Sequence, residues 1–194
     1  MSSGSGIMHE EMPTVRPEGL AGLQLWLNLP AREKMSRPKY RDLPADRLPA
    51  VEATGGAIVR PIAGAADAGR LVGPVDGLAV APKFLDVTLP AGTAFRETVP
   101  RDHTAFAYLE HGDVRFGPEQ TEVHGPSLVI FGNGDLVEAS GGTAGGSFLL
   151  AAARPLHEPI ARYGPFVMNT RAEIEQALQE LRTGRFIRDE PRDG

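Results

Sequence analysis

The sequence predicts an all-β fold that ends in a single helix. Gly and Pro account for 23 and 17 of the 194 residues. Many of them separate short apolar runs at close intervals, which is typical of short strands joined by turns. Strands of this length and spacing indicate a sandwich or a barrel. The predicted strands are 48–52, 57–62, 84–89, 105–109, 113–116, 128–131, 136–139 and 147–153.

The predicted helix covers residues 170–183. Thr170 is a favourable N-cap, and Glu173 follows three residues later, which is the spacing of a capping box. Gly184 is suited to ending the helix. Residues at positions i, i+3, i+4 and i+7 form one apolar stripe for docking on a barrel surface, namely Ile174, Ala177, Leu178 and Leu181.

A candidate metal half-site lies near the N-terminus. His9 and Glu11 are two residues apart, so in a strand their side chains would point to the same face. One imidazole and one carboxylate make half of a nitrogen–oxygen site that suits non-haem iron. Gly4 and Gly6 allow a tight turn before this strand. The alternative is a solvated surface pair.

The segment that follows alternates apolar and polar residues over 23–29, which predicts a strand with one aliphatic face. Trp26 is expected to pack in the barrel wall, with substrate contact as the alternative. Residues 31–49 read as a long excursion and 63–82 as a loop. The basic run in the first of these is interpreted as a solvated surface and comprises Lys34, Arg37, Lys39 and Arg41.

Composition excludes several functions. A net charge of −5 and a pI near 5.6 argue against unaided binding to nucleic acid or to an anionic membrane. Without cysteine there is no disulfide framework and no thiolate chemistry. No apolar run approaches the roughly 18 residues of a membrane span. The first residues lack the features of a secretion signal, so a cytoplasmic protein is expected.

Three stretches of sequence resemble the pirin family: GIMHEEMP at 6–13, LAGLQLWLNLP at 20–30 and YGPFVMNT at 163–170. The resemblance runs in order to about residue 186. It implies two tandem cupin jelly-roll β-barrels. Residues 1–55 would be the C-terminal part of the first barrel with a linker, and 56–194 the complete second barrel with its closing helix.

The resemblance also implies a metal, Fe(II) or another divalent ion, held in the first barrel by a His-x-His pair and a His-x-Glu pair. His9 and Glu11 match the second pair. The first pair has no counterpart, because the five histidines are His9, His103, His111, His124 and His157. We therefore expect a pirin that lacks the front of its first barrel, through fragmentation, a misassigned start at Met1 or deliberate truncation. Metal binding should be impaired, since catalytic sites usually have three or more protein ligands.

The second barrel is expected to be structural and free of metal. The cupin metal motif aligned from Gly92 to Gly112 places Thr98 and Pro100 at the histidine positions and Ala105 near the glutamate position. His103 is then a lone loop imidazole. The glycine-rich stretch 141–146 could cradle an anion, but a hairpin loop between two strands is the preferred interpretation.

The resemblance implies an iron-dependent dioxygenase that acts on flavonols such as quercetin, with Glu11 also able to act as a base. The alternative is a non-catalytic, metal-responsive regulator that binds a protein partner, as transcriptional co-regulators do. A third reading is an inactive fragment. Fold alone does not choose among these, because function depends on the site.

Overall fold

The structure is a computed structural model that describes residues 1–12, 17, 19, 22–188 and 192–193. The chain divides into two compact units, one formed by Met1–Asp42 with Leu156–Gly194 and the other by Leu43–Pro155. The sequence analysis placed a boundary at residue 55, where the resemblance puts the end of the first barrel and its linker. The contact-based units have other bounds, and the boundary between barrels stays a prediction. The predicted class is confirmed: the described part of the chain is rich in strands and has one α-helix.

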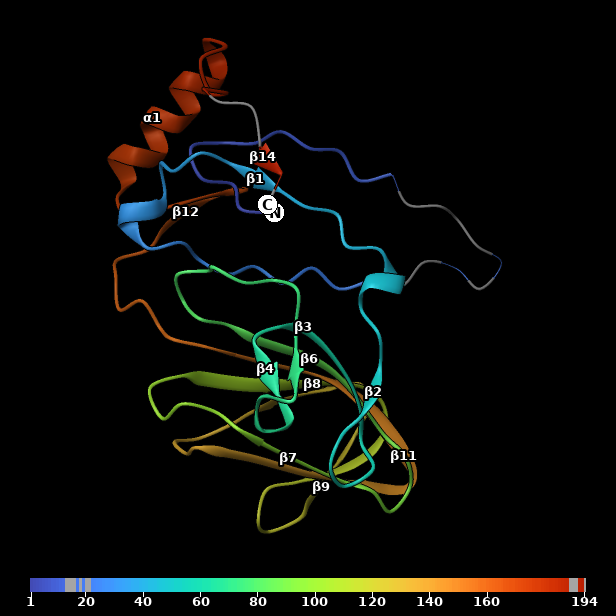
Figure 1. The fold of residues 1–194 in the computed structure, drawn as a ribbon. Helices are drawn as coiled ribbons and strands as arrows, with labels where there is room; N and C mark the ends of the chain where they lie inside the picture. Colours follow the sequence, from blue (N-terminus) through green and yellow to red (C-terminus); the bar gives the residue numbers. More distant parts are fainter. Residues whose placement is uncertain (13–16, 18, 20–21, 189–191, 194) are drawn as a thin grey trace. The chain divides into compact units, whose positions relative to one another are not determined.

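The second unit is built on an antiparallel eight-stranded sheet (Figure 1). Its central path runs β10-β8-β11-β6-β3-β2, with β7 paired to β11 and β9 paired to β8. The strands are β2 (Val51–Glu52), β3 (Ile58–Ala63), β6 (Lys83–Leu89), β7 (Ala94–Thr98), β8 (Thr104–Phe116), β9 (Thr121–His124), β10 (Ser127–Ile130) and β11 (Leu136–Ala153). A short helical turn, η2 (Ala45–Arg47), precedes β2.

Two of these strands are longer than predicted. The turns expected at 110–112 and 141–146 lie inside β8 and β11, which pair with each other through a register shift between Gly141 and Gly146. The hairpin loop predicted at 141–146 is therefore wrong. Glycines at this point let the paired strands β8 and β11 bend. They also let β11 approach β6 closely, since a Cβ at Gly145 would overlap the carbonyl of Leu89.

Alternate residues of the strands form the core of the second unit. Leu85, Val87 and Leu89 of β6 are at most 1% exposed, as period-two burial requires. Phe148 of β11 packs edge-on against Phe95 of β7 and Phe116 of β8. The strand predicted at 84–89 is therefore confirmed, and one of its faces belongs to the core.

Several of the strands in the described part of the chain were not predicted. The expected loop 63–82 contains a small antiparallel hairpin made of β4 (Ala65–Ala66), the turn η3 (Asp67–Gly69) and β5 (Leu71–Val72). The strands β7 and β9 were also missed, because their sequences AFRET and TEVH carry few apolar residues.

The first unit contains α1 (Arg171–Arg182), as the capping box predicts. The Thr170 hydroxyl accepts from the backbone N–H of Glu173, and hydrogen bonds from Thr170 to the Glu173 carboxylate lower the pKa of that group. Ile174 is the buried member of the predicted apolar stripe. The unit also contains η1 (Ala31–Glu33), the parallel pair β1 (Lys39–Tyr40) with β14 (Arg192–Asp193), and the antiparallel pair β12 (Ala161–Tyr163) with β13 (Phe166–Met168).

The strand predicted over 23–29 is wrong. These residues form no ladder with any described segment, and a strand needs a neighbour to take up its backbone hydrogen bonds. Leu23 and Leu27 are 57% and 42% exposed. Trp26 is 50% exposed, with the Arg162 guanidinium 5.3 Å from its ring centroid, so the expected wall packing is also wrong.

Candidate functional site

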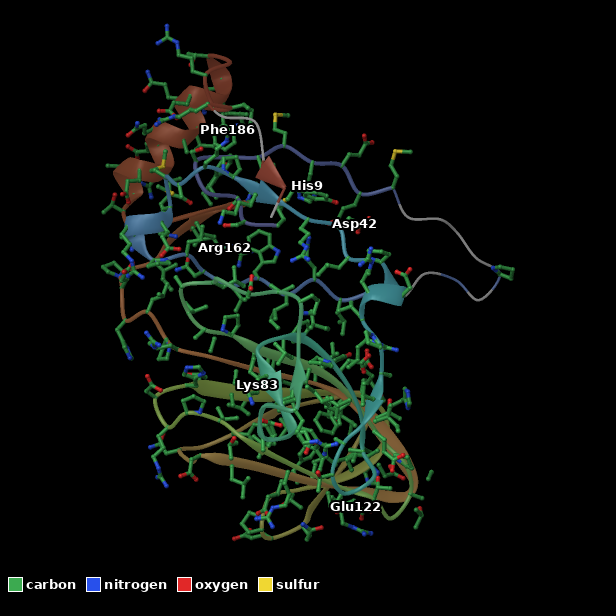
Figure 2. The ribbon with its side chains drawn as sticks, in the orientation of Figure 1. His9, Asp42, Lys83, Glu122, Arg162 and Phe186 are labelled. Atoms are coloured by element: carbon green, nitrogen blue, oxygen red, sulfur yellow. The ribbon has the colours of Figure 1, made fainter. Side chains whose placement is uncertain are left out.

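The predicted ligands His9 and Glu11 lie on an exposed N-terminal segment without regular secondary structure (Figure 2). The expected turn before them is confirmed, since Gly6 N–H donates to the Ser3 carbonyl at 2.9 Å and Gly4 has a φ of +47°. The strand expected to orient them is wrong. Glu11 Oε1 instead accepts from Gln24 Nε2 at 3.1 Å, which links the segment to the exposed stretch 22–27.

The donor set does not amount to a metal centre. Within the described ranges, no three His, Cys, Asp or Glu side chains converge in a way that could hold a metal ion. His9 and Glu11 supply one nitrogen and one carboxylate, the correct chemistry for iron but too few ligands. No reaction step through a metal follows from these residues alone.

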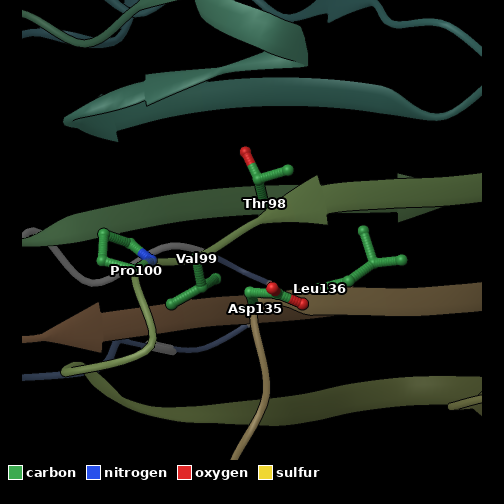
Figure 3. A pocket seen from close by; sticks show the side chains of 5 residues that line it. All are labelled: Thr98, Val99, Pro100, Asp135 and Leu136. Carbon is green, nitrogen blue, oxygen red and sulfur yellow. The ribbon is translucent and has the colours of Figure 1, made fainter.

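A shallow hollow of about 490 Å³ lies where β7 ends and β11 begins (Figure 3). Its lining includes Thr98 and Pro100, the two positions that the cupin motif would give to histidines, together with Val99, Asp135 and Leu136. Asp135 is held in an ion pair with Arg101 at 2.5 Å. The lining thus offers one exposed, already paired carboxylate and no imidazole.

A buried polar network in the first unit was missed by the sequence analysis. Lys34 is 4% exposed, so its assignment to a solvated basic run is wrong. Its ammonium donates to Asn28 Oδ1 at 2.7 Å and to the Val167 carbonyl at 2.9 Å. Burial lowers the pKa of Lys34, an effect that Glu158 and Glu173 oppose. The network joins the segment before η1 to β13.

Glu158 is the acceptor at a second junction of the same unit. Its Oε2 accepts from the backbone N–H of Ala31 at 2.7 Å and from Asn169 Nδ2 at 3.0 Å. In the sequence, Glu158 is marked only by its place after the last long predicted strand, 147–153, and that place predicts no partner. Lys34 and Glu158 therefore fix the backbone of the first unit rather than offer groups to a ligand.

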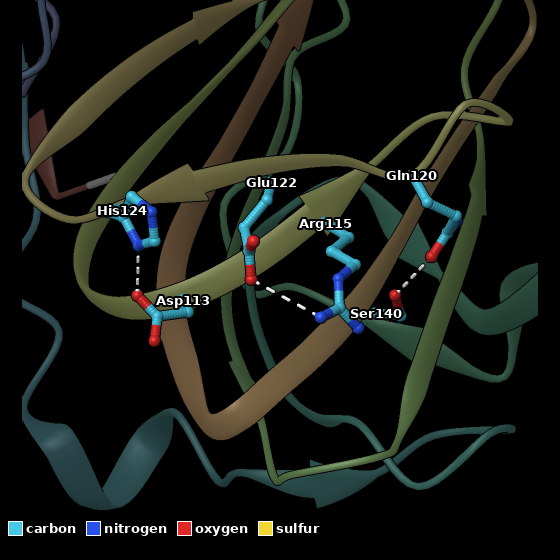
Figure 4. Close-up of polar contacts among 6 residues, drawn as sticks. All are labelled: Asp113, Arg115, Gln120, Glu122, His124 and Ser140. Carbon is cyan, nitrogen blue, oxygen red and sulfur yellow. Dashed lines mark hydrogen bonds and ion pairs between the residues drawn. The ribbon is translucent and has the colours of Figure 1, made fainter.

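On the outer face of β8 and β9, charged side chains pair across the strands (Figure 4). His124 Nδ1 lies 2.6 Å from Asp113 Oδ1, and Arg115 Nη2 lies 3.4 Å from Glu122 Oε1. Ser140 donates to Gln120 Oε1 at 2.7 Å. The hydrogen bond to Asp113 raises the pKa of His124, because the carboxylate favours the charged imidazole.

Replacing Asp113 with Asn should move the pKa of His124 back toward 6.5. Since the folded-state pKa is raised, the pair stabilises the hairpin fully below the unfolded pKa, and this contribution is lost as the pH rises through the folded pKa. An NMR titration of the His124 ring checks the shift. Asp135→Asn, which removes a carboxylate paired with Arg101 instead, should leave the titration unchanged; equal curves for all three proteins would contradict the assignment.

The antiparallel sheet of the second unit and its likeness to known domains place the chain in the cupin fold class. The pirin C-terminal cupin domain matches residues 84–187. The chain belongs to the pirin family, as the sequence resemblance predicted. No helix in the described residues is long and apolar enough to cross a membrane.

Relatives and solved structures agree with this assignment. A pirin-like protein of Caulobacter vibrioides is 42% identical over 186 residues, which is 96% of this chain and 66% of the relative. Pirin-1 of Arabidopsis thaliana is 40% identical over 95% of the chain and 64% of its own length. The crystal structure of a quercetin 2,3-dioxygenase from Acinetobacter baumannii is similar with a TM-score of 0.73 and 31% identity, over 83% of this chain and 55% of that one. The chain thus spans about two thirds of the length of the curated relatives.

Proposed function

We propose that this chain is the larger part of an iron-dependent dioxygenase that acts on flavonols, and that His9 and Glu11 are two ligands of its metal. The observation that carries the proposal is the likeness to the Acinetobacter quercetin 2,3-dioxygenase, which extends over 83% of the chain. The chemistry of the pair supports it, since imidazole and carboxylate suit non-haem iron.

The remaining ligands would come from polypeptide outside the described residues. The length of the relatives leaves room for such a polypeptide, because about a third of the Caulobacter protein lies outside its match to this chain. Glu11 would also be available as a base toward a substrate hydroxyl. In the chain by itself its carboxylate accepts from Gln24 Nε2 at 3.1 Å.

We expect the unmatched part of the Caulobacter relative, fused to the N-terminus of this chain, to restore near-stoichiometric iron. Elemental analysis after desalting measures the metal, and a quercetin assay under air measures turnover. The chain without the fusion should retain little iron, because two ligands rarely hold a metal.

The double change His9→Ala with Glu11→Ala should abolish iron retention in the fused protein. A matched control, Glu10→Ala with His111→Ala, removes the same two chemical groups from exposed positions and should keep the metal. Iron that survives the loss of His9 and Glu11 would contradict their role. Iron that depends on both residues without quercetin turnover would favour the regulatory alternative, in which the metal-bearing protein binds a partner.

A further inference from the structure

The hairpin β4-η3-β5 is attached to the second unit by a narrow neck. Gly73 N–H donates to the Gly64 carbonyl at 2.9 Å, and Ala63 bridges Val75. Both ends of the hairpin therefore leave the unit side by side. Gly64 has a φ of +75°, which a glycine adopts without strain.

The tip of this hairpin is bonded to a buried charge. The backbone N–H of Asp67 donates to Glu97 Oε2 at 2.9 Å. Glu97 lies on β7 with its side chain 2% exposed, and its other oxygen pairs with the ammonium of Lys83, at the start of β6. Lys83 is labelled in Figure 2. A buried carboxylate needs every such partner, so the hairpin tip is part of what keeps this charge satisfied.

The same tip is strained. Asp67 and Ala68 have φ values of +50° and +54°, a region that residues with a Cβ rarely adopt. An ion pair between Asp67 and Arg70 at 2.7 Å closes the turn. Ala66 is 1% exposed and Leu71 packs on the core, whereas Val72 is 71% exposed. Strain at the tip favours release, whereas the bond to Glu97 and the packing of Ala66 and Leu71 on the core oppose it.

We propose that residues 65–72 are a lid on the second unit and that Glu97 is its latch. In the closed state the lid amide and Lys83 share the Glu97 carboxylate. In the open state the tip relaxes out of its left-handed conformation and the Lys83–Glu97 pair becomes accessible. A ligand or partner that binds one of these two states more tightly would shift the equilibrium between the closed and the open hairpin.

Hydrogen exchange of the full chain tests the lid. Glu97→Gln keeps an acceptor but loses the charge, and it should speed exchange at the Asp67 amide and across 65–72 by about tenfold or more. Amides of β8 and β11 should keep their protection. Asp86→Asn, which removes a carboxylate paired with Arg60 on neighbouring β3, is the matched control and should leave lid exchange unchanged.

A second variant tests the strain without touching the latch. Ala68→Gly relieves the positive φ and should slow exchange across the lid several-fold. Unchanged lid exchange in this variant would overturn the proposal, and so would a Glu97→Gln protein that loses protection in β8 and β11 as much as in the lid. If Glu97→Gln fails to fold, Ala68→Gly decides alone: slower lid exchange with unchanged strands supports the lid.

Discussion

Replacing Phe148 with Ala should lower the free energy of unfolding of the second unit by about 3–5 kcal/mol. Phe148 is fully buried in β11, and its ring meets two others edge-on. The centroids lie 5.7 Å from Phe95 and 5.3 Å from Phe116, with interplanar angles of 80° and 70°. Truncation removes the ring that takes part in both pairs. It leaves a cavity in the core, next to Phe95 of β7 and Phe116 of β8.

Urea unfolding measures this effect. Far-UV circular dichroism follows the strands, which lie mainly in the second unit, while Trp26 is the single tryptophan and reports on the first unit. The control is Ile130→Ala in β10, where the side chain is 73% exposed and truncation should cost at most about 0.5 kcal/mol. Equal losses in the two variants would show that Phe148 is not central to the core.

The sequence predicts those elements whose pattern is local. Short apolar runs bounded by turn residues located β3, β6 and β10 within a residue or two, and the Thr170–Glu173 capping box located α1. These signals depend on near neighbours along the chain, where period and spacing act directly. The fold class followed from the same signals.

Elements that depend on distant partners were not predictable. The alternation at 23–29 is a good strand pattern, but the described residues offer it no neighbour, so Leu23, Leu25 and Leu27 stay exposed. Lys34 resembles the other cations of its run, and only a folded chain brings Asn28 and the Val167 carbonyl to its ammonium. The sequence gives the type of each side chain but does not show which distant residues it contacts in the folded chain.

The candidate site shows the same limit. The spacing of His9 and Glu11 was readable, and so was the absence of a second histidine pair. Whether two groups make a metal centre depends on ligands from elsewhere in space, which spacing cannot supply. The Gln24 amide that contacts Glu11 had no signal in the sequence.

Glycine was misread because it serves two purposes. Gly112 and Gly145 look like turn residues, yet they lie where β8 and β11 bend while still paired, each with positive φ. Gly117 has a similar φ of +73° and does stand in a turn, directly after β8. The strand glycines and the turn glycine differ in how close neighbouring backbone atoms lie to the position of a Cβ, and only the structure shows this difference.

Gly112→Ala should therefore destabilise the second unit by about 3 kcal/mol or more. A Cβ at Gly112 would overlap the Gly145 carbonyl and lie 2.6 Å from the Gly146 Cα. These are backbone atoms of the paired strand, so they cannot move aside unless β8 and β11 separate. The φ of +82° adds the usual penalty for an L-residue.

Gly117→Ala is the matched control, because it carries nearly the same φ with nothing within 4 Å of the added Cβ. It should lose only the conformational term, about 1–2 kcal/mol. The difference between the two variants in urea unfolding isolates the close approach of the strands from backbone strain. A Gly112→Ala protein no less stable than Gly117→Ala would mean that β8 and β11 can part at the bend, and that a turn at 110–112, as the sequence first indicated, is accessible to the chain.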